Sequence, residues 1–307
     1  MSGINQFQND AVASQNLGHN KLVLDSQTII SQIAITPSDF AFTTITDALD
    51  TDKWVELFKK PKASRGFLTP KCDDNADKSK EATFFDSKIN GQLKISNGLI
   101  TIELIHGTEN EKLYQKIISF DNKTVRVFLC DINDNIIGTS PDNTKIRGFE
   151  TTIFVTNRKL SDGTKPSQFS IILNLKNTTE WRNQKVVMQP MKLAEPWQID
   201  NYDGVYDTYL TTSNVTAAGM NVKVTIDSYV ETDPSGQISS LTKDDFVLKD
   251  STGAAKTITS ATYTDDGYVI VATLATGDTI NLKECASLSP VDIWIESTGA
   301  KILTVTA

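Results

Sequence analysis

Residues 92–105 read Gln-Leu-Lys-Ile-Ser-Asn-Gly-Leu-Ile-Thr-Ile-Glu-Leu-Ile and are the clearest indication of fold class in the first part of the chain. Apolar and polar residues alternate on both sides of Asn97-Gly98, which is the pattern of half-buried strands. An Asn-Gly pair favours the positive backbone angles of a two-residue hairpin turn. The stretch therefore predicts two antiparallel strands, 92–95 and 99–105, that pair with each other across Asn97-Gly98.

Several other stretches between residues 84 and 190 carry the strand pattern, and few positions there offer a helix of normal length. Turn residues separate them, for example Ser161-Asp162-Gly163-Thr164. We expect a mainly β body, a β-sandwich or barrel. Its further predicted strands are residues 124–130, 136–138, 149–155 and 169–175.

From Val205 the composition shifts to Thr, Ser, Val, Asp and Gly, and about seven short strand patterns follow one another. Turn signals every 8–12 residues are typical of a β-sandwich. The predicted strands are residues 222–226, 245–250, 257–263, 268–274, 279–282, 292–295 and 301–305.

The chain of 307 residues is long enough for two domains. We expect an extended N-terminal arm at 1–20, a β-rich assembly body at 21–190, a linker at 191–204 that contains Pro196 and Gly204, and a terminal domain at 205–307. Within the body, one short helix is predicted over residues 48–58, capped by Ser38 or Thr46 and stopped by Lys59-Lys60-Pro61-Lys62. Residues 59–82 then read as a long loop, and loops of this length in compact domains are usually functional or bound by a partner.

Charge is unevenly distributed along the chain. The first 204 residues hold 25 acidic and 24 basic side chains, whereas residues 205–307 hold 13 and 6, which accounts for most of the net charge of −8. An acidic surface repels nucleic acid and gives no footprint for gripping it. The short basic run Lys59-Lys60-Pro61-Lys62 with Lys71 fits a solvated loop or a contact with an acidic partner.

No segment predicts export or membrane insertion. No apolar run approaches the length that spans a bilayer, and the first ten residues lack the basic and apolar regions of a secretory signal. The three cysteines, Cys72, Cys130 and Cys285, lie far apart in the sequence, so we expect free thiols in a reducing compartment.

Catalytic motifs are absent from the sequence, and we expect no enzyme activity, no catalytic residue and no cofactor. The two histidines, His19 and His106, form no metal-ligand pair. There is no nucleophile elbow, no phosphate-binding glycine loop and no dinucleotide fingerprint. A carboxylate pair of the glycosidase type would need candidates such as Glu103, Asp131, Asp134 or Glu150.

Two further patterns leave alternatives open. Asp131-Ile132-Asn133-Asp134-Asn135 resembles the start of a calcium loop but lacks its glycine and its final glutamate, so it is either an ordinary turn or a weak cation site; we assign no metal. Aromatic rings also stack on sugars, so the tryptophans either fill cores and junctions or form a glycan platform. They are Trp54, Trp181, Trp197 and Trp294.

The segment from Val205 onward resembles bacterial immunoglobulin-like modules. The resemblance is carried by residues 241–253, Leu-Thr-Lys-Asp-Asp-Phe-Val-Leu-Lys-Asp-Ser-Thr-Gly, and by 258–261 and 267–270. It covers about a third of the chain. It implies a sandwich fold and says nothing of a ligand.

Residues 80–190 resemble tail-tube-like structural proteins of tailed phages, on the stretches 116–129 and 142–149. The resemblance implies a homo-oligomer in a virion, made in the host cytoplasm, whose rings contact other virion proteins. In that reading DNA passes through the rings without specific binding, and the terminal domain is a peripheral module that can touch host-surface glycans. The alternative is a carbohydrate-binding surface or fibre protein, and a third hypothesis is a glycan-active enzyme with a sandwich accessory domain.

Overall fold

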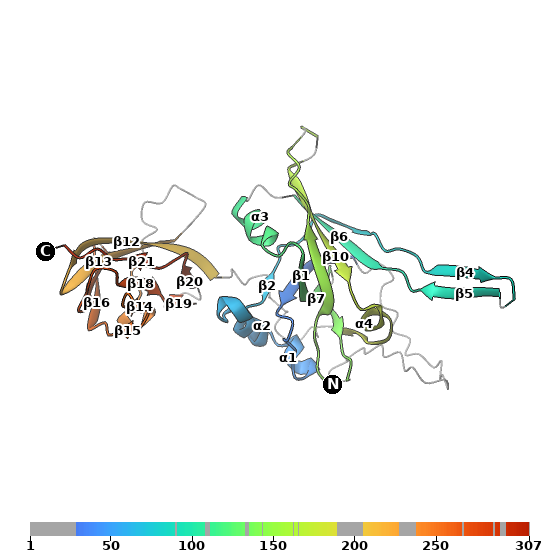
Figure 1. Cartoon of the computed structure of the whole chain (residues 1–307), viewed down its shortest axis with the longest axis horizontal. Helices are drawn as coiled ribbons and strands as arrows, with labels where there is room; N and C mark the ends of the chain where they lie inside the picture. The colour runs from blue at the N-terminus through green and yellow to red at the C-terminus, as the bar shows by residue number, and fades with distance from the viewer. Residues whose placement is uncertain are drawn as a thin grey trace. The chain divides into compact units, whose positions relative to one another are not determined.

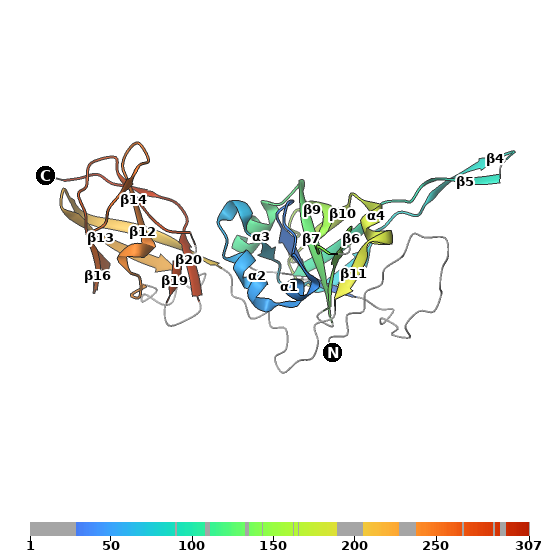
Figure 2. The ribbon, with the colours of Figure 1, turned by 90° about the horizontal axis from the view of Figure 1, so that it is seen from below.

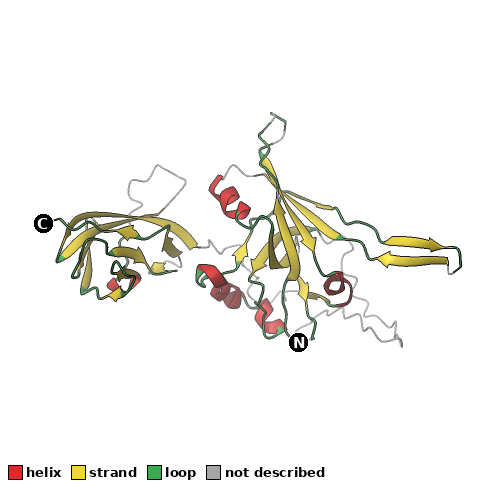
Figure 3. Cartoon of the chain, viewed as in Figure 1, coloured by secondary structure: helices red, strands yellow, loops and turns green. Residues whose placement is uncertain are grey.

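The computed structural model confirms a mainly β chain (Figures 1 and 3). It describes residues 29–89, 91–107, 111–132, 135–142, 144–161, 163–164, 166–188, 205–226, 238–265, 267–284, 286–288 and 293–306. The predicted arm at 1–20 and the predicted linker at 191–204 lie outside these residues.

The chain divides into two compact units. The first comprises residues 1–54 and 64–199, and the second comprises residues 55–63 and 200–307. Each unit has its own hydrophobic core, so each is described by itself.

The first unit is built on a sheet that has nine strands among the described residues. Its central strand, β7, pairs with β1 on one side and with β9 and β8 on the other. The nine strands are β1 (Ile30–Thr36), β2 (Phe67–Leu68), β3 (Asp74–Asp77), β6 (Ile100–Gly107), β7 (Lys123–Asp131), β8 (Ile136–Thr139), β9 (Phe149–Val155), β10 (Gln168–Leu175) and β11 (Lys185–Met188).

Backbone pairing closes most of this sheet into a ring. From β7 the ring passes through β9, β10, β6 and β3 in one direction, and through β1 and β2 in the other. Residues 67–77 join the two arcs, because the Cys72 amide donates to the Ser31 carbonyl (2.7 Å) and the Asp73 amide donates to the Ile105 carbonyl (2.9 Å). The apolar side chains that alternate along these strands meet inside the ring, where they form the core.

Short helices flank the strands of the first unit. The sequence predicted one helix over 48–58, and the structure has two there, α1 (Ile45–Leu49) and α2 (Thr51–Phe58). The predicted caps were wrong: the Thr44 hydroxyl accepts from the Asp47 amide and the Asp47 carboxylate accepts in return, which is a capping box. Residues 55–63 belong to the second unit, and they include the end of α2 and most of η1 (Lys62–Ser64). The other helices of the first unit are α3 (Glu111–Ile118) and α4 (Thr178–Asn183).

The predicted loop at 59–82 was only partly right. It contains η1 and the strands β2 and β3, whose backbone groups complete the ring. Composition concealed these strands, because Asp74-Asn75-Ala76-Asp77 has almost no β propensity and is held in the sheet by pairing with the apolar strand β6.

The second unit contains two sheets that share one core. The larger has the order β16 (Ser260–Thr264), β17 (Gly267–Val271), β13 (Gly219–Ile226), β12 (Val205–Thr216), β20 (Ile293–Ser297) and β19 (Ala286–Leu288). The smaller has the order β15 (Ala255–Lys256), β14 (Phe246–Lys249), β18 (Thr279–Leu282) and β21 (Lys301–Ile302), and the short helix η3 (Lys243–Asp245) precedes β14. Buried residues of both sheets, among them Val222, Ile270, Leu248 and Ile280, belong to the same cluster.

Candidate assembly interface

A two-stranded hairpin extends out of the first unit, away from its sheet (Figures 1 and 2). It consists of β4 (Thr83–Ser87) and β5 (Gly91–Ser96), which pair only with each other among the described strands. This corrects the hairpin predicted from Asn97-Gly98: residues 92–95 pair with β4, and residues 100–107 pair with β3 and β10.

The hairpin continues two strands of the ring. Beyond the β3–β6 pairing, the Lys78 amide donates to the Thr101 carbonyl (2.9 Å) and the Lys80 amide donates to the Leu99 carbonyl (2.8 Å). The β4–β5 pairing begins at Thr83 and Ser96. The chain therefore runs from core to tip and back as one long antiparallel ribbon.

Gly98 lies where this ribbon leaves the sheet. Its φ is +77°, a conformation that L side chains rarely adopt, and a Cβ there would collide with the carbonyl groups of Lys80 and Glu81. The Asn97-Gly98 pair thus marks a position that requires glycine. That position lies where the hairpin leaves the sheet, and it is not a turn between two paired strands.

The hairpin has an apolar face. Phe85 lies opposite Leu93, and Ile95 lies two residues further along the same strand, so the three side chains project to one side. Phe84, Asp86, Gln92 and Lys94 project to the other side. The exposed fractions of Phe85, Leu93 and Ile95 are 56%, 45% and 66%. The hairpin therefore exposes to solvent the kind of apolar face that a half-buried strand normally packs against a core. Exposed apolar surfaces of this kind are typical of interaction sites.

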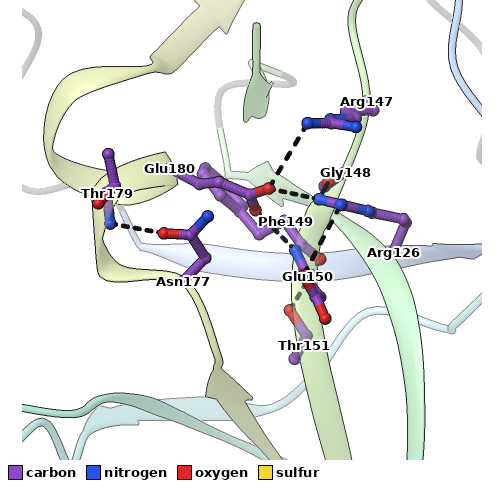
Figure 4. Close-up of polar contacts among 9 residues, drawn as sticks. All are labelled: Arg126, Arg147, Gly148, Phe149, Glu150, Thr151, Asn177, Thr179 and Glu180. Atoms are coloured by element: carbon purple, nitrogen blue, oxygen red, sulfur yellow. Dashed lines mark hydrogen bonds and ion pairs between the residues drawn. The ribbon is translucent and has the colours of Figure 1, made fainter. Parts of the chain in front are cut away.

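The strongest polar cluster of the first unit has a structural role (Figure 4). The Glu180 side chain is 2% exposed, and its carboxylate accepts from Arg126 Nη1 (2.6 Å) and from the Glu150 amide (2.9 Å). Arg126 also donates to the Gly148 carbonyl (3.2 Å), and Arg147 approaches Glu180 at 3.9 Å. The three contacts of Glu180 join α4 to β7, to β9 and to the segment before β9, so the cluster holds the helix in place.

The carboxylate candidates that the structure describes each have a local partner. Glu103, on β6, is paired with Lys78 (3.7 Å), and Glu150 lies 3.8 Å from Arg126. One Asp131 carboxylate oxygen accepts from the Asn135 backbone N–H (2.9 Å) and the other accepts from Asn135 Nδ2 (2.7 Å), so Asp131 closes a turn. Asp134 is outside the described residues. No group of three potential metal ligands occurs in the part of the chain that the structure describes.

The tryptophans differ in their surroundings. Trp54 is buried against Phe42 and Phe128 and donates from Nε1 to the Ala48 carbonyl (2.9 Å), so it fills the core. Trp181 is half-buried on Phe149 with the Lys185 ammonium 4.1 Å from its ring centroid. Trp294 is half-buried on β20, and Trp197 lies outside the described residues.

His106 is buried near the end of β6 and stacks on Phe169, with ring centroids 5.4 Å apart. Burial lowers its pKa, and the nearby Asp73 and a bond to the Lys71 backbone offset this effect only in part. Its Nε2 is buried with no hydrogen-bond partner. His106 is therefore a neutral core residue. His19 lies outside the described residues.

The burial of His106 predicts a pH dependence of stability. Because its pKa is lower in the folded chain than in the unfolded chain, the unfolded state binds more protons as the pH falls below about 6.5. The free energy of unfolding of the first unit should therefore be highest above this pH. It should decline below it by up to about 1.4 kcal/mol per pH unit, until the lowered folded pKa is reached.

Urea unfolding of the parent chain and of His106→Phe between pH 7.5 and 5 measures this effect. The variant should lack the part of the slope that His106 contributes. Identical slopes in the two proteins would contradict the assignment of His106 as a buried neutral group.

No helix in the described part of the chain is long and apolar enough to cross a membrane. Comparison of the chain with protein-family models, with curated proteins and with solved structures found no match.

Sequence reasoning missed the hairpin as an exposed arm, although a signal for it exists. Asn90-Gly91 is a second Asn-Gly pair, and the strands on either side of it have the lengths of β4 and β5. Gly91 has a φ of +70°. Only the three-dimensional pairing distinguishes Gly91, which begins β5, from Gly98, which lies at the junction.

Proposed function

We propose that this chain is a structural protein that assembles with copies of itself in a phage virion, most specifically as a tail-tube subunit whose rings let DNA pass. The observation that carries the proposal is the amphipathic hairpin β4–β5, which exposes an apolar face beyond the sheet from which it extends. The resemblance of residues 80–190 to tail-tube-like proteins supplies the class of assembly. In this proposal the protein is not an enzyme, and it reaches the virion from the host cytoplasm.

The magnitudes favour a repeated interface over a single contact. Fully burying an apolar side chain contributes about 1.5–3 kcal/mol. Phe85, Leu93 and Ile95 are about half exposed, so covering each of them in an interface would contribute roughly half of that amount. Association itself costs about 4–15 kcal/mol in lost freedom. Three half-exposed side chains do not offset that cost alone, whereas backbone pairing along the hairpin and several contacts per subunit in a closed ring do.

The charge distribution supports passage of DNA without binding. Residues 1–204 are nearly neutral and residues 205–307 are acidic. Binding to DNA strengthens with the number of phosphates that Lys and Arg neutralise, so this composition favours weak contact with DNA. The described tryptophans do not favour the alternative of a carbohydrate-binding surface or fibre protein, since Trp54 is buried and Trp181 and Trp294 are half-buried.

Leu93→Asp tests the proposal. A charge in the middle of the apolar face should weaken self-association at least tenfold, because a buried unpaired carboxylate is costly. Sedimentation velocity over a range of concentrations measures the association, and negative-stain microscopy shows whether rings or tubes form. At protein concentrations too low for assembly, the first unit should unfold at the same denaturant concentration as in the parent, since Leu93 lies outside its core.

Phe84→Asp is the matched control. It adds the same charge on the opposite face of the hairpin, directly across from Lys94, and should assemble like the parent. A parent chain that stays monomeric at high concentration would overturn the proposed function. Equal assembly of Leu93→Asp and the parent would remove the hairpin from it.

A further inference from the structure

The second unit presents an open strand edge of unusual composition. Strand β16 lies at one end of the six-stranded sheet, pairs with β17, and has no strand on its outer side among those that the structure describes. Its residues, Ser260-Ala261-Thr262-Tyr263-Thr264, include no charge and no proline, and the last three are exposed. Edge strands in soluble proteins usually carry such residues to prevent pairing with other chains.

The surface next to this edge is apolar. Val269 and Val271 of β17 lie opposite Thr262 and Ser260 and project to the same outer face of the sheet. Their exposed fractions are 37% and 42%. A ribbon added beside β16 would extend this face by two strands, and its own apolar side chains would lie on the same face as the two valines, with β16 between them.

The hairpin and β16 match in length and in charge. Strands β4 and β16 are both five residues long. Residues 78–99 carry four lysines against Glu81 and Asp86, a net charge of +2, whereas residues 205–307 carry −7. Opposite charges on two surfaces speed their encounter and disfavour wrong partners.

We propose that the hairpin β4–β5 of one copy of this chain adds to the edge of β16 in a second copy and extends its six-stranded sheet. The hairpin strand that lies against β16 gives the backbone groups on the outer edge of β16 partners that they otherwise find only in water. Pairing of two hairpins with each other is disfavoured, because it would bring two surfaces of charge +2 together. The inference rests on the proposed function, since it names the surface that receives the assembly hairpin.

This interface joins two different surfaces of the same chain. Each copy therefore has one hairpin that can bind a neighbour and one β16 edge to which a neighbour's hairpin can bind. Such head-to-tail contacts produce a ring where the rotation closes and an open filament where it does not. They also allow two defective copies to bind each other when mixed, because a copy that has lost one of the two surfaces still has the other.

The experiment uses two full-length variants. Leu93→Asp disables the hairpin and leaves the β16 edge intact, and Thr262→Lys places a charge on the edge and leaves the hairpin intact. Sedimentation velocity should show each variant alone to associate at least tenfold more weakly than the parent. An equimolar mixture should form a one-to-one dimer and nothing larger, because only one productive contact remains per pair.

Matched controls and denaturation curves separate this result from misfolding. Thr304→Lys adds the same charge at an exposed position that follows β21, a strand of the smaller sheet. This variant should assemble like the parent. At protein concentrations too low for assembly, all variants should keep the parent's unfolding midpoints.

Three other outcomes would contradict the further inference, and they differ in what they imply for the proposed function. Loss of assembly in Leu93→Asp with normal assembly of Thr262→Lys would overturn this inference and leave the proposed function standing, with another surface as the receptor. A mixture that forms no dimer would overturn it in favour of contacts between like surfaces. A parent that never assembles would overturn both.

Discussion

Replacing Glu180 by alanine should lower the free energy of unfolding of the first unit by about 3–5 kcal/mol, the loss seen when one partner of a buried ion pair is removed. The carboxylate is the closest anion to Arg126, and the next one, Glu150, lies 3.8 Å away. The variant leaves the Arg126 charge buried with the Gly148 carbonyl as its nearest acceptor, and it deprives the Glu150 amide of its acceptor. Chemical denaturation followed by tryptophan fluorescence measures the loss.

A double variant distinguishes the cost of a broken pair from the value of the pair. Arg126→Met combined with Glu180→Leu removes both charges and keeps apolar volume, so it should recover most of the stability that Glu180→Ala loses. A loss below about 1 kcal/mol in Glu180→Ala would place the cluster among exposed ion pairs and contradict its structural role.

Trp54→Ala is expected to destabilise the first unit by about 3–5 kcal/mol, the range for deleting a buried tryptophan. The indole is 1% exposed and lies 4.8 Å from the Phe42 ring and 5.1 Å from the Phe128 ring, centroid to centroid. Its removal leaves a cavity that these rings cannot fill without leaving their own contacts. Thermal unfolding by calorimetry and denaturant titration both measure the change.

Trp54→Phe is the conservative control. It keeps an aromatic ring in the cluster and loses the bond from Nε1 to the Ala48 carbonyl, so the loss should be clearly smaller than that of the alanine variant. Equal stability of Trp54→Ala and the parent would show that this ring is not a core residue.

The sequence predicted the class of the fold because strand propensity is a local property. Residues 124–130, 149–155 and 169–175 are rich in β-branched, aromatic and other apolar residues, and each becomes a strand of the ring. Pairing is not local, and this is why the predicted hairpin failed. Strand β6 has the better partner in β10, with eight matched residues, and β5 is left to pair with β4.

The candidate interface depends on the same non-local information. Alternation around Leu93 and Ile95 predicts a buried face, and nothing in the local sequence says that the core on which such a strand would pack is absent. The Arg126–Glu180 cluster is hidden for a related reason, since its two charges are 54 residues apart. By contrast, the interpretation of Asp131–Asn135 as a turn needs only neighbouring residues, and the bonds between Asp131 and Asn135 agree with it.

The continuity of the hairpin with β3 and β6 has a mechanical consequence. A load applied at the tip travels along the strands, while their hydrogen bonds run across them. The load therefore acts on many bonds in shear, and they must yield together instead of opening one at a time. Behind the junction, β6 is held by β3 on one side and by β10 on the other. A subunit joined to its neighbours through this hairpin would pass tension directly into its own core, as a component of a structure under strain requires.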